Sequence, residues 1–184
     1  ETRPIKGTRP RGRTPEEDRA LSDELLSSTK DRAENVMIVD LLRNDLGRVC
    51  TPGSIRVPQL CQLESYPNVH HLVSVVQGQL AAQHSPLSLL TAAFPGGSIT
   101  GAPKIRAMQI IDELEPCQRS VYCGSLGYID VRGSMDTSIA IRTMVADDGA
   151  LHVWGGGGLV ADSKADEEYT ETLDKIRHLI DALE

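Results

Sequence analysis

Aromatic residues are scarce in this chain, and it has no excess of positive charge. Only 3% of the 184 residues are aromatic, and the formal net charge is −7. Proteins that bind single-stranded nucleic acid usually offer aromatic rings for base stacking, and both nucleic acids and anionic membranes attract basic surfaces. The composition therefore argues against generic binding to nucleic acid or to membranes.

Long apolar runs and paired cysteines are also missing. No window reaches the roughly 20 apolar residues that a membrane-spanning helix needs, and no secretory signal opens the chain. The four cysteines form no CxxC pair, and no histidine lies near them at zinc-ligand spacing. The simplest interpretation is a reduced, cytoplasmic, globular protein with buried thiols.

Helix and strand signals occur in blocks rather than in regular alternation. Thr14, Pro15 and Glu17 predict a helix start, with Thr14 as the N-cap and Glu17 closing a capping box. This helical pattern is predicted to break at residues 27–28 and to end near Gly47. The other predicted elements are a loop or short strand in 3–13, two strands within 54–80, helices at 86–93 and 103–116, a loop at 94–101, strands at 121–131, 135–146 and 151–160, and a helix at 165–183. The order predicts an α+β fold with antiparallel sheets flanked by helices.

Two carboxylates near the end of the chain have the spacing of a functional pair. Glu168 and Glu171 are three residues apart, which places them on one face of a helix. A glycine run, residues 155–158, precedes them, and a backbone without side chains can approach an anion closely. The pattern suggests an anion held beside a metal ion. A flexible turn before a charged surface helix is the alternative that an isolated acidic pair favours.

Six ordered runs resemble the chorismate-utilising enzymes, a family that includes the anthranilate, aminodeoxychorismate, isochorismate and salicylate synthases. The runs are PIKGT at 4–8, AEN through RND at 33–45, FPGGSITGAPK at 94–104, GSLGY at 124–128, MDTSIAIRT at 135–143, and the glycine run through Lys175. The resemblance implies that residues 1–184 form the C-terminal portion of a chorismate-binding two-sheet sandwich. Lysine at position 6 resembles the aminodeoxychorismate synthases, whereas anthranilate synthases usually carry a small residue there.

The resemblance implies a role for particular side chains. Glu34, Glu168 and Glu171 would hold Mg²⁺, which favours hard oxygen ligands. Lys6 would attack ring carbon C2 of chorismate and expel the C4 hydroxyl, and His71 would pack beside the ring. The implied substrate-binding residues are Thr100, Tyr128, Arg142, Gly156, Gly157, Gly158 and Lys175. Glu167 is interpreted as a decoy, because it lies on a different face of the helix from Glu171.

Several of these residues also have a purely structural interpretation. Lys6 alone would suggest an ordinary surface lysine, and Glu34 a solvated or helix-capping acid. A histidine in an apolar strand, such as His71, is more often a satisfied core residue. Arg142 lies in a strand that is predicted to be buried, where it would pair with a substrate carboxylate or with a core acid. Thr100 would bind substrate or shape a tight turn.

The implied reaction is the amination of chorismate to 4-amino-4-deoxychorismate, on the path to 4-aminobenzoate and folate. Its partners would be chorismate and a glutamine amidotransferase that supplies ammonia. The alternatives are anthranilate synthesis and a non-catalytic scaffold. A phosphate-binding loop is weaker still, because the glycine runs lack the Gly-Lys-Ser/Thr signature.

Family members are considerably longer than this chain, and their first half supplies a general acid from an A-S-P-E run. We therefore expect the chain alone to be nearly inactive, because a general acid contributes about 10²–10⁴-fold to the rate. An uncovered sheet edge would also favour a homodimer of the fragment.

Overall fold

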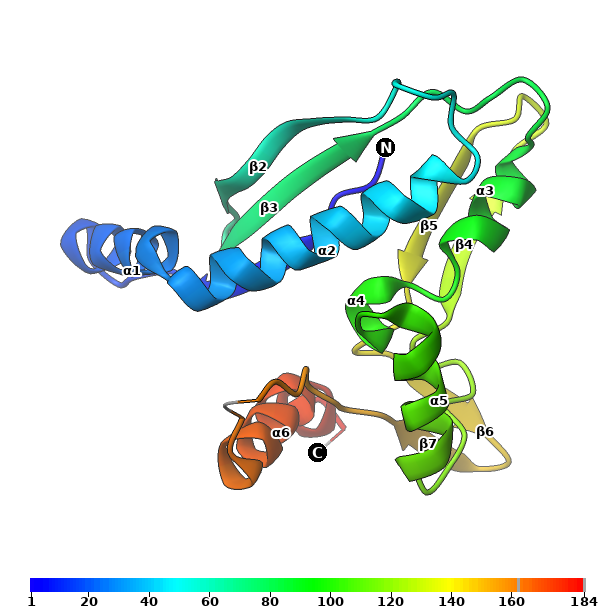
Figure 1. Ribbon diagram of the computed structural model, residues 1–184. Helices are drawn as coiled ribbons and strands as arrows, with labels where there is room; N and C mark the ends of the chain where they lie inside the picture. The colour runs from blue at the N-terminus through cyan, green and yellow to red at the C-terminus, as the bar shows by residue number, and fades with distance from the viewer. Residues whose placement is uncertain (162, 184) are drawn as a thin grey trace. The chain divides into compact units, whose positions relative to one another are not determined.

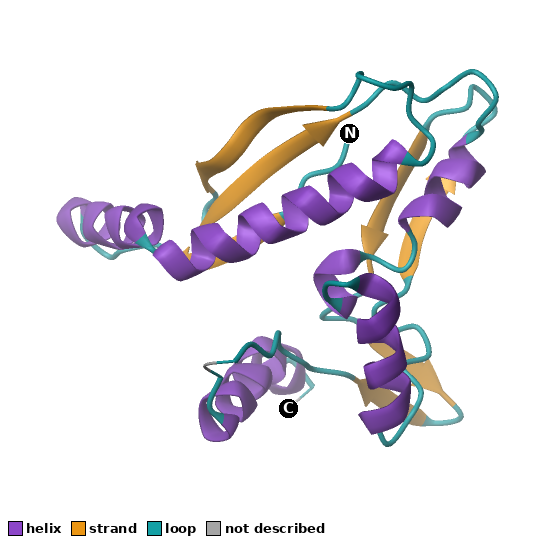
Figure 2. Ribbon diagram, viewed as in Figure 1, coloured by secondary structure: helices purple, strands orange, loops and turns teal. Residues whose placement is uncertain are grey.

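The computed structural model describes residues 1–161 and 163–183. They form two compact units, Glu1–Ser98 and Ile99–Glu184 (Figure 1). Both units combine helices and strands (Figure 2), and the strand pairs in the described residues are antiparallel. The predicted α+β fold is confirmed.

The first unit is built on a three-stranded sheet in the order β1–β3–β2. The strands are β1 (Ile5–Pro10), β2 (Arg56–Ser65) and β3 (Val69–Gln77). The central strand is buried on both faces, as its run of apolar residues predicts. Helix α2 (Thr29–Gly47) runs along the sheet (Figure 1), and its Val39 and Leu46 form a core cluster with Val76 of β3. The sheet and this helix therefore carry the core of the first unit.

Side-chain caps begin the first two helices. Helix α1 spans Pro15–Ser27, and Thr14 Oγ1 accepts a hydrogen bond from the N–H of Glu17 at 3.2 Å. The Glu17 carboxylate reaches back to the N–H of Arg13 at 2.8 Å, one residue earlier than a capping box requires. Ser28 then caps α2 by accepting from the N–H of Asp31 at 3.2 Å. The predicted helix start, the break and the end at Gly47 are confirmed, as is the helix at 86–93 (α3, Pro86–Ala93).

A buried polar network joins α2 to the sheet. Asn35 and Ser74 are both 0% exposed, and the Ser74 hydroxyl donates to Asn35 Oδ1. Asn35 Nδ2 donates to the carbonyl of Leu72 at 3.1 Å, and Ser74 Oγ accepts the N–H of Cys61 at 2.8 Å. The network therefore ties one helix to β2 and β3, and it satisfies polar groups that would otherwise be costly to bury.

A second network holds α1 against β3. His70 is 2% exposed, with Nε2 3.0 Å from Asp18 Oδ1 and Nδ1 2.8 Å from Ser65 Oγ. Asp18 also accepts two hydrogen bonds from the Arg11 guanidinium, each at 2.8 Å, and one from the N–H of Gly12 at 2.8 Å. Hydrogen bonding from Arg11, and then from Gly12, holds the pKa of the Asp18 carboxyl well below its usual range.

This pKa shift predicts an acid-dependent loss of stability. A carboxyl whose pKa is depressed in the folded state contributes stability above its unfolded pKa, about 3.9, and loses that contribution as pH falls through the native value. Below pH ~4 the wild type should bind about one more proton when it unfolds than the Asp18→Asn variant does. Denaturant unfolding between pH 2 and 6 measures this difference as the slope of the unfolding free energy against pH. Asp23→Asn, at an exposed site of the same helix, is the control, and equal slopes for both variants would contradict the prediction.

In its described residues, the second unit contains two separate hairpins and two long helices. Its elements are α5 (Lys104–Leu114), β4 (Ser125–Ile129), β5 (Met135–Ile139), β6 (Met144–Asp147), β7 (Ala150–Val153) and α6 (Ala165–Asp181). Gly133, and the pair Asp148 and Gly149, have positive φ at the two hairpin turns, where the sequence predicts them. Apart from Cys123 and Ala140, the buried apolar residues of the described chain all belong to the first unit.

The strands of the second unit differ from the prediction. Those expected at 121–131, 135–146 and 151–160 are shorter, and the middle one is divided into β5 and β6. Arg142 lies in the break with φ of 50°, a conformation that a continuous strand excludes. The loop expected at 94–101 contains the short helix α4 (Gly97–Thr100).

The cysteine expectation is confirmed for three of the four thiols. All four cysteines are free; Cys50, Cys61 and Cys123 are buried, but Cys117 is exposed. Among the described residues, none of the helices combines the length and hydropathy needed to cross a membrane.

Candidate functional site

The first strand and α2 bring Lys6 and Glu34 together. Lys6 Nζ lies 3.8 Å from Glu34 Oε2, and the two side chains are 24% and 26% exposed. The register of β1 against β3 shifts between Ile5 and Thr8, where Gly7 has φ of 86°. A Cβ at Gly7 would lie 2.9 Å from Asp31 Cβ, so glycine permits β1 to approach the helices closely. Lys6 is therefore a half-buried lysine that faces a carboxylate, not a free surface side chain.

The two neighbouring histidines have different surroundings. Both ring nitrogens of buried His70 face polar side chains, as expected of a satisfied core residue. His71 is only partly buried, with Nδ1 2.8 Å from Thr8 Oγ1 and its ring 5.7 Å from that of Tyr66. Thr8 is two residues from Lys6 on β1 and pairs with His71 in the sheet. The sheet thus places the two candidate catalytic residues on adjacent strands.

In the second unit, the glycine run packs against α6 between Glu168 and Ile176. Lys175 Nζ donates to the carbonyl of Gly156 at 3.3 Å and pairs with Glu171 Oε1 at 2.6 Å. A Cβ on Gly157 would lie 3.1 Å from Glu168 Oε2 and 3.8 Å from Lys175 Nζ. The glycines therefore leave a space beside a lysine and two carboxylates that any larger residue would fill. The expectation that Glu167 lies on a different face from Glu171 is wrong, because residues four apart on a helix share a face. Glu167 is distinguished instead by its partner, since it pairs with Lys164 at 2.8 Å.

The other predicted substrate-binding residues lie on the strands, the short helix and the connecting segments of the chain from residue 97 onwards. Tyr128 is on β4, opposite Asp136, and is 59% exposed. Arg142 is exposed, and so is neighbouring Ile141, because the strand that was expected to bury them is interrupted there. The prediction of an inward-facing arginine in a buried strand is wrong. Thr100 is half-buried at the end of α4, and Gly158 is exposed in the segment before α6.

The predicted magnesium ligands are divided between the units. Glu34 belongs to α2, whereas Glu168 and Glu171 belong to α6. Within the described residues, no group of three His, Cys, Asp or Glu side chains is arranged to hold a metal ion. The donor chemistry nevertheless fits: the α6 carboxylates offer hard oxygen atoms beside a glycine backbone, and Ser163 Oγ orients Glu168 by a hydrogen bond of 2.5 Å.

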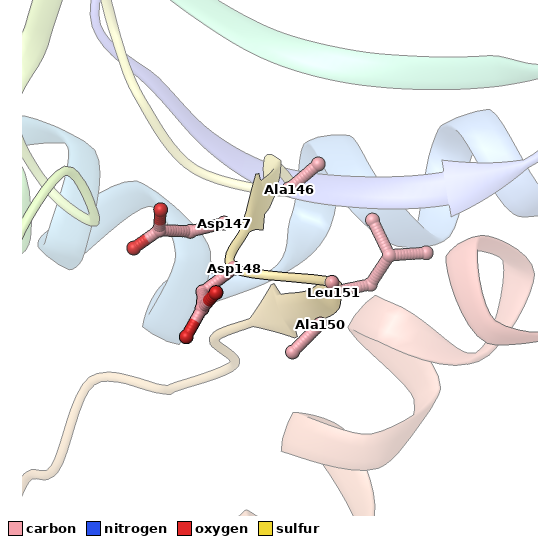
Figure 3. Close-up of a pocket in the computed structure, with 6 residues that line it drawn as sticks. Ala146, Asp147, Asp148, Ala150 and Leu151 are labelled. Atoms are coloured by element: carbon pink, nitrogen blue, oxygen red, sulfur yellow. The ribbon is translucent and has the colours of Figure 1, made fainter.

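A shallow hollow lies at the β6–β7 hairpin and is lined by residues 146–151. Figure 3 shows the carboxylates of Asp147 and Asp148 projecting away from Leu151. None of the predicted site residues lines this hollow, so it has no part in the candidate site.

Sequence reasoning missed two residues that lie beside the candidate site, Tyr122 and Ser163, and one that supports Tyr122 from behind, Arg119. Tyr122 lies against Gly156, Ser163 binds Glu168, and Arg119 packs on the Tyr122 ring. Arg119 and Tyr122 belong to no motif, and the proximity of Tyr122 to the glycine run depends on the path of the loop before β4. Only Ser163, five residues before Glu168, has a spacing that the sequence could have indicated.

Comparison with known proteins supplies a family. Residues 1–181 match the family described as chorismate binding enzyme. Aminodeoxychorismate synthase component 1 of Klebsiella aerogenes is 58% identical over the whole chain, and anthranilate synthase component 1 of Aquifex aeolicus is 52% identical over the whole chain. The chain spans 41% and 37% of these two proteins, respectively.

A solved structure agrees with this match. Anthranilate synthase component I from Streptococcus pneumoniae superposes with a TM-score of 0.86 at 44% identity, over 96% of this chain and 38% of that one. Since both fold and sequence match over nearly the full length, the chain belongs to the chorismate binding enzyme family.

Proposed function

We propose that this chain carries part of the site that aminates chorismate with ammonia to give 4-amino-4-deoxychorismate. The observation that carries the proposal is Lys6, a half-buried lysine whose amine lies 3.8 Å from Glu34. The named relatives of the two kinds differ little in identity, 58% and 52%, so overall similarity distinguishes them weakly. Lysine at position 6 of the PIKGT run, where anthranilate synthases usually carry a small residue, favours the aminating branch.

In the proposed reaction, Lys6 acts as the nucleophile. Its deprotonated amine forms a bond to C2 of the ring, both conjugated ring double bonds shift by one position toward C4, and the C4–O bond breaks. Ammonia then forms a bond to C4, both double bonds shift back, and the C2–N bond to Lys6 breaks. The departing hydroxyl must be protonated, and the A-S-P-E run that resembles the family's general acid does not occur in these 184 residues. Turnover by these residues alone is therefore proposed to be slow.

The substrate's carboxylates are proposed to bind to the second unit. Lys175 and the backbone of Gly156–Gly158 offer one cation and a backbone that an anion can approach. Arg142, with a planar guanidinium suited to two hydrogen bonds, and Tyr128 would bind the other carboxylate, because both are exposed. Thr100 and His71 would contact the ring substituents.

Glu34, Glu168 and Glu171 are proposed to hold Mg²⁺, which would offset the negative charge of the bound dicarboxylate. Two of these carboxylates face lysines: Glu34 faces Lys6, and Glu171 faces Lys175. Ammonia would come from a glutamine amidotransferase partner, since both named relatives are called component 1.

Calorimetry on this chain tests the proposed binding site. Chorismate should bind in the presence of Mg²⁺, and Glu168→Gln should weaken that binding by at least about 10-fold, because an amide is a poorer ligand for a hard cation than a carboxylate. Glu167→Gln is the matched control, since Glu167 is on the same helical turn but pairs with Lys164.

If the wild type, Glu168→Gln and Glu167→Gln bind chorismate with equal affinity in the presence of Mg²⁺, the carboxylates of α6 have no part in the binding site. Absence of Mg²⁺-dependent chorismate binding in the wild type would instead favour the non-catalytic scaffold. Formation of anthranilate in place of the amino product would favour the anthranilate synthase alternative.

A further inference from the structure

The glycine run is confined on two sides. On the α6 side, a Cβ at Gly155 would lie 3.0 Å from Thr172 Cγ2 and 3.1 Å from Ile176 Cγ2. On the other side, a Cβ at Gly156 would lie 2.7 Å from the Tyr122 hydroxyl oxygen. Real Cβ atoms essentially never approach another heavy atom so closely, and the next ring atom, Cζ, is 3.7 Å away. The Tyr122 hydroxyl therefore occupies the space where a side chain at position 156 would begin.

Tyr122 is itself held in place. The Arg119 guanidinium lies 5.9 Å from its ring centroid, and the N–H of Tyr122 donates to the Arg119 carbonyl at 2.8 Å. Arg119 is fixed in turn by the Glu115 carboxylate, with its shortest contact at 2.6 Å, and by the carbonyl of Ile99 at 2.9 Å. The next residue, Cys123, has φ of 64° and donates its N–H to Ala140 at 2.9 Å. The loop therefore cannot move away from Gly156 without losing several hydrogen bonds.

We propose that Tyr122 is a positioning residue for the glycine run, which sets the place of the Gly156 peptide in the substrate site; this rests on the proposed function. Tyr122 contacts the α-carbon side of Gly156, and Lys175 holds its carbonyl from α6 at 3.3 Å. The peptide is thus fixed between two side chains before substrate arrives, which lowers the entropy lost on binding.

The chemistry of the phenol suits this position. Burial, followed by interactions with Cys123, raises the pKa of Tyr122 to about 12. The hydroxyl therefore stays protonated over the physiological range, and it brings no negative charge to a site proposed to receive a carboxylate. Arg119, which packs on the Tyr122 ring, also donates to the carbonyl of Ile99, the neighbour of Thr100. Arg119 and Tyr122 therefore connect two of the segments proposed to bind the substrate.

A double-mutant cycle on this chain tests the contact without depending on activity. Gly156→Ala should lower the melting temperature by about 3–8 °C, because the added methyl group meets the hydroxyl. In Tyr122→Phe the nearest remaining atom is at ordinary van der Waals distance, so the double variant should recover most of that loss. Gly47→Ala is the control, because its nearest neighbour would be at 3.7 Å. Additive effects of the two substitutions would overturn the proposal.

Fluorescence and binding separate positioning from bulk stability. Trp154 is the single tryptophan and lies two residues before Gly156, so its emission reports on this run. Gly156→Ala should shift the emission and weaken Mg²⁺-dependent chorismate binding by at least about 5-fold, and Tyr122→Phe should reverse both changes. If the double variant recovers the melting temperature but its emission and chorismate binding stay altered, Tyr122 only stabilises the fold and does not position the glycine run.

The same experiments distinguish failure of this proposal from failure of the proposed function. A wild type that binds no chorismate, but shows coupled melting temperatures and a rescued Trp154 emission, would overturn the function and keep the positioning role. A wild type that binds chorismate, together with additive changes in melting temperature for the two substitutions, would support the proposed function and overturn the positioning role. If Gly156→Ala fails to fold, recovery of the folded protein in the double variant is the supporting result, and its failure to recover is the opposing one.

Discussion

Replacing Lys6 with alanine is expected to lower kcat/KM for the amination of chorismate by on the order of 10³-fold or more, because the proposed nucleophile is lost. The measurement requires an active protein, so residues 1–184 would replace the matching segment of the Klebsiella aerogenes relative, of which the chain spans 41%. Product formation with ammonia as the nitrogen source avoids dependence on the partner subunit.

The control for this variant is Lys30→Ala, at an exposed lysine of α2. It should leave the rate within about 2-fold, since surface substitutions away from a site change little. Unchanged activity in Lys6→Ala would contradict the nucleophile role. A switch of product to anthranilate or isochorismate would instead assign Lys6 to selecting the product, with the proposed carboxylate-binding groups of the second unit retained.

Asn35→Ala is expected to lower the free energy of unfolding by about 2–4 kcal/mol. Its amide is fully buried, accepts from the Ser74 hydroxyl and donates to the Leu72 carbonyl. Alanine would leave both partners without a bond in a region closed to water, and it would also open a small cavity. Denaturant unfolding, read at a fixed m-value, measures the change.

Asn44→Ala provides the comparison, because Asn44 is an exposed residue of the same helix. Its effect should lie within about 0.5 kcal/mol of zero. A similar small effect for Asn35→Ala would mean that the network contributes no net stability. Ser74→Ala should resemble Asn35→Ala, since it leaves the N–H of Cys61 without its acceptor.

Local sequence signals predicted the first unit well. Thr14 and Ser28 cap helices in sequence and in structure, because a hydroxyl three residues before a free N–H can bond it with little help from elsewhere. The central strand was similarly visible as an apolar run. The difference between His70 and His71 was not visible, since it depends on Asp18, 52 residues before His70 in the chain.

The second unit was harder to predict for a physical reason. The alternating pattern through Ile139 and Ile141 indicated one strand, but Arg142 adopts a positive φ that sequence alone did not indicate. The Glu168, Glu171 and Lys175 spacing on α6 was predictable, because helical periodicity fixes it. The contact of Tyr122 with Gly156 was not, because it arises from the fold of a loop.

The distribution of buried side chains has a consequence for local opening. Since nearly all buried apolar residues lie before Ser98, the resistance of the backbone to hydrogen exchange should be concentrated there. The amides of α6 and the glycine run would then exchange through partial opening, well before the sheet of the first unit unfolds. A dicarboxylate that binds to those glycines would stabilise this region against partial opening. Binding would therefore slow deuterium uptake in about the last thirty residues.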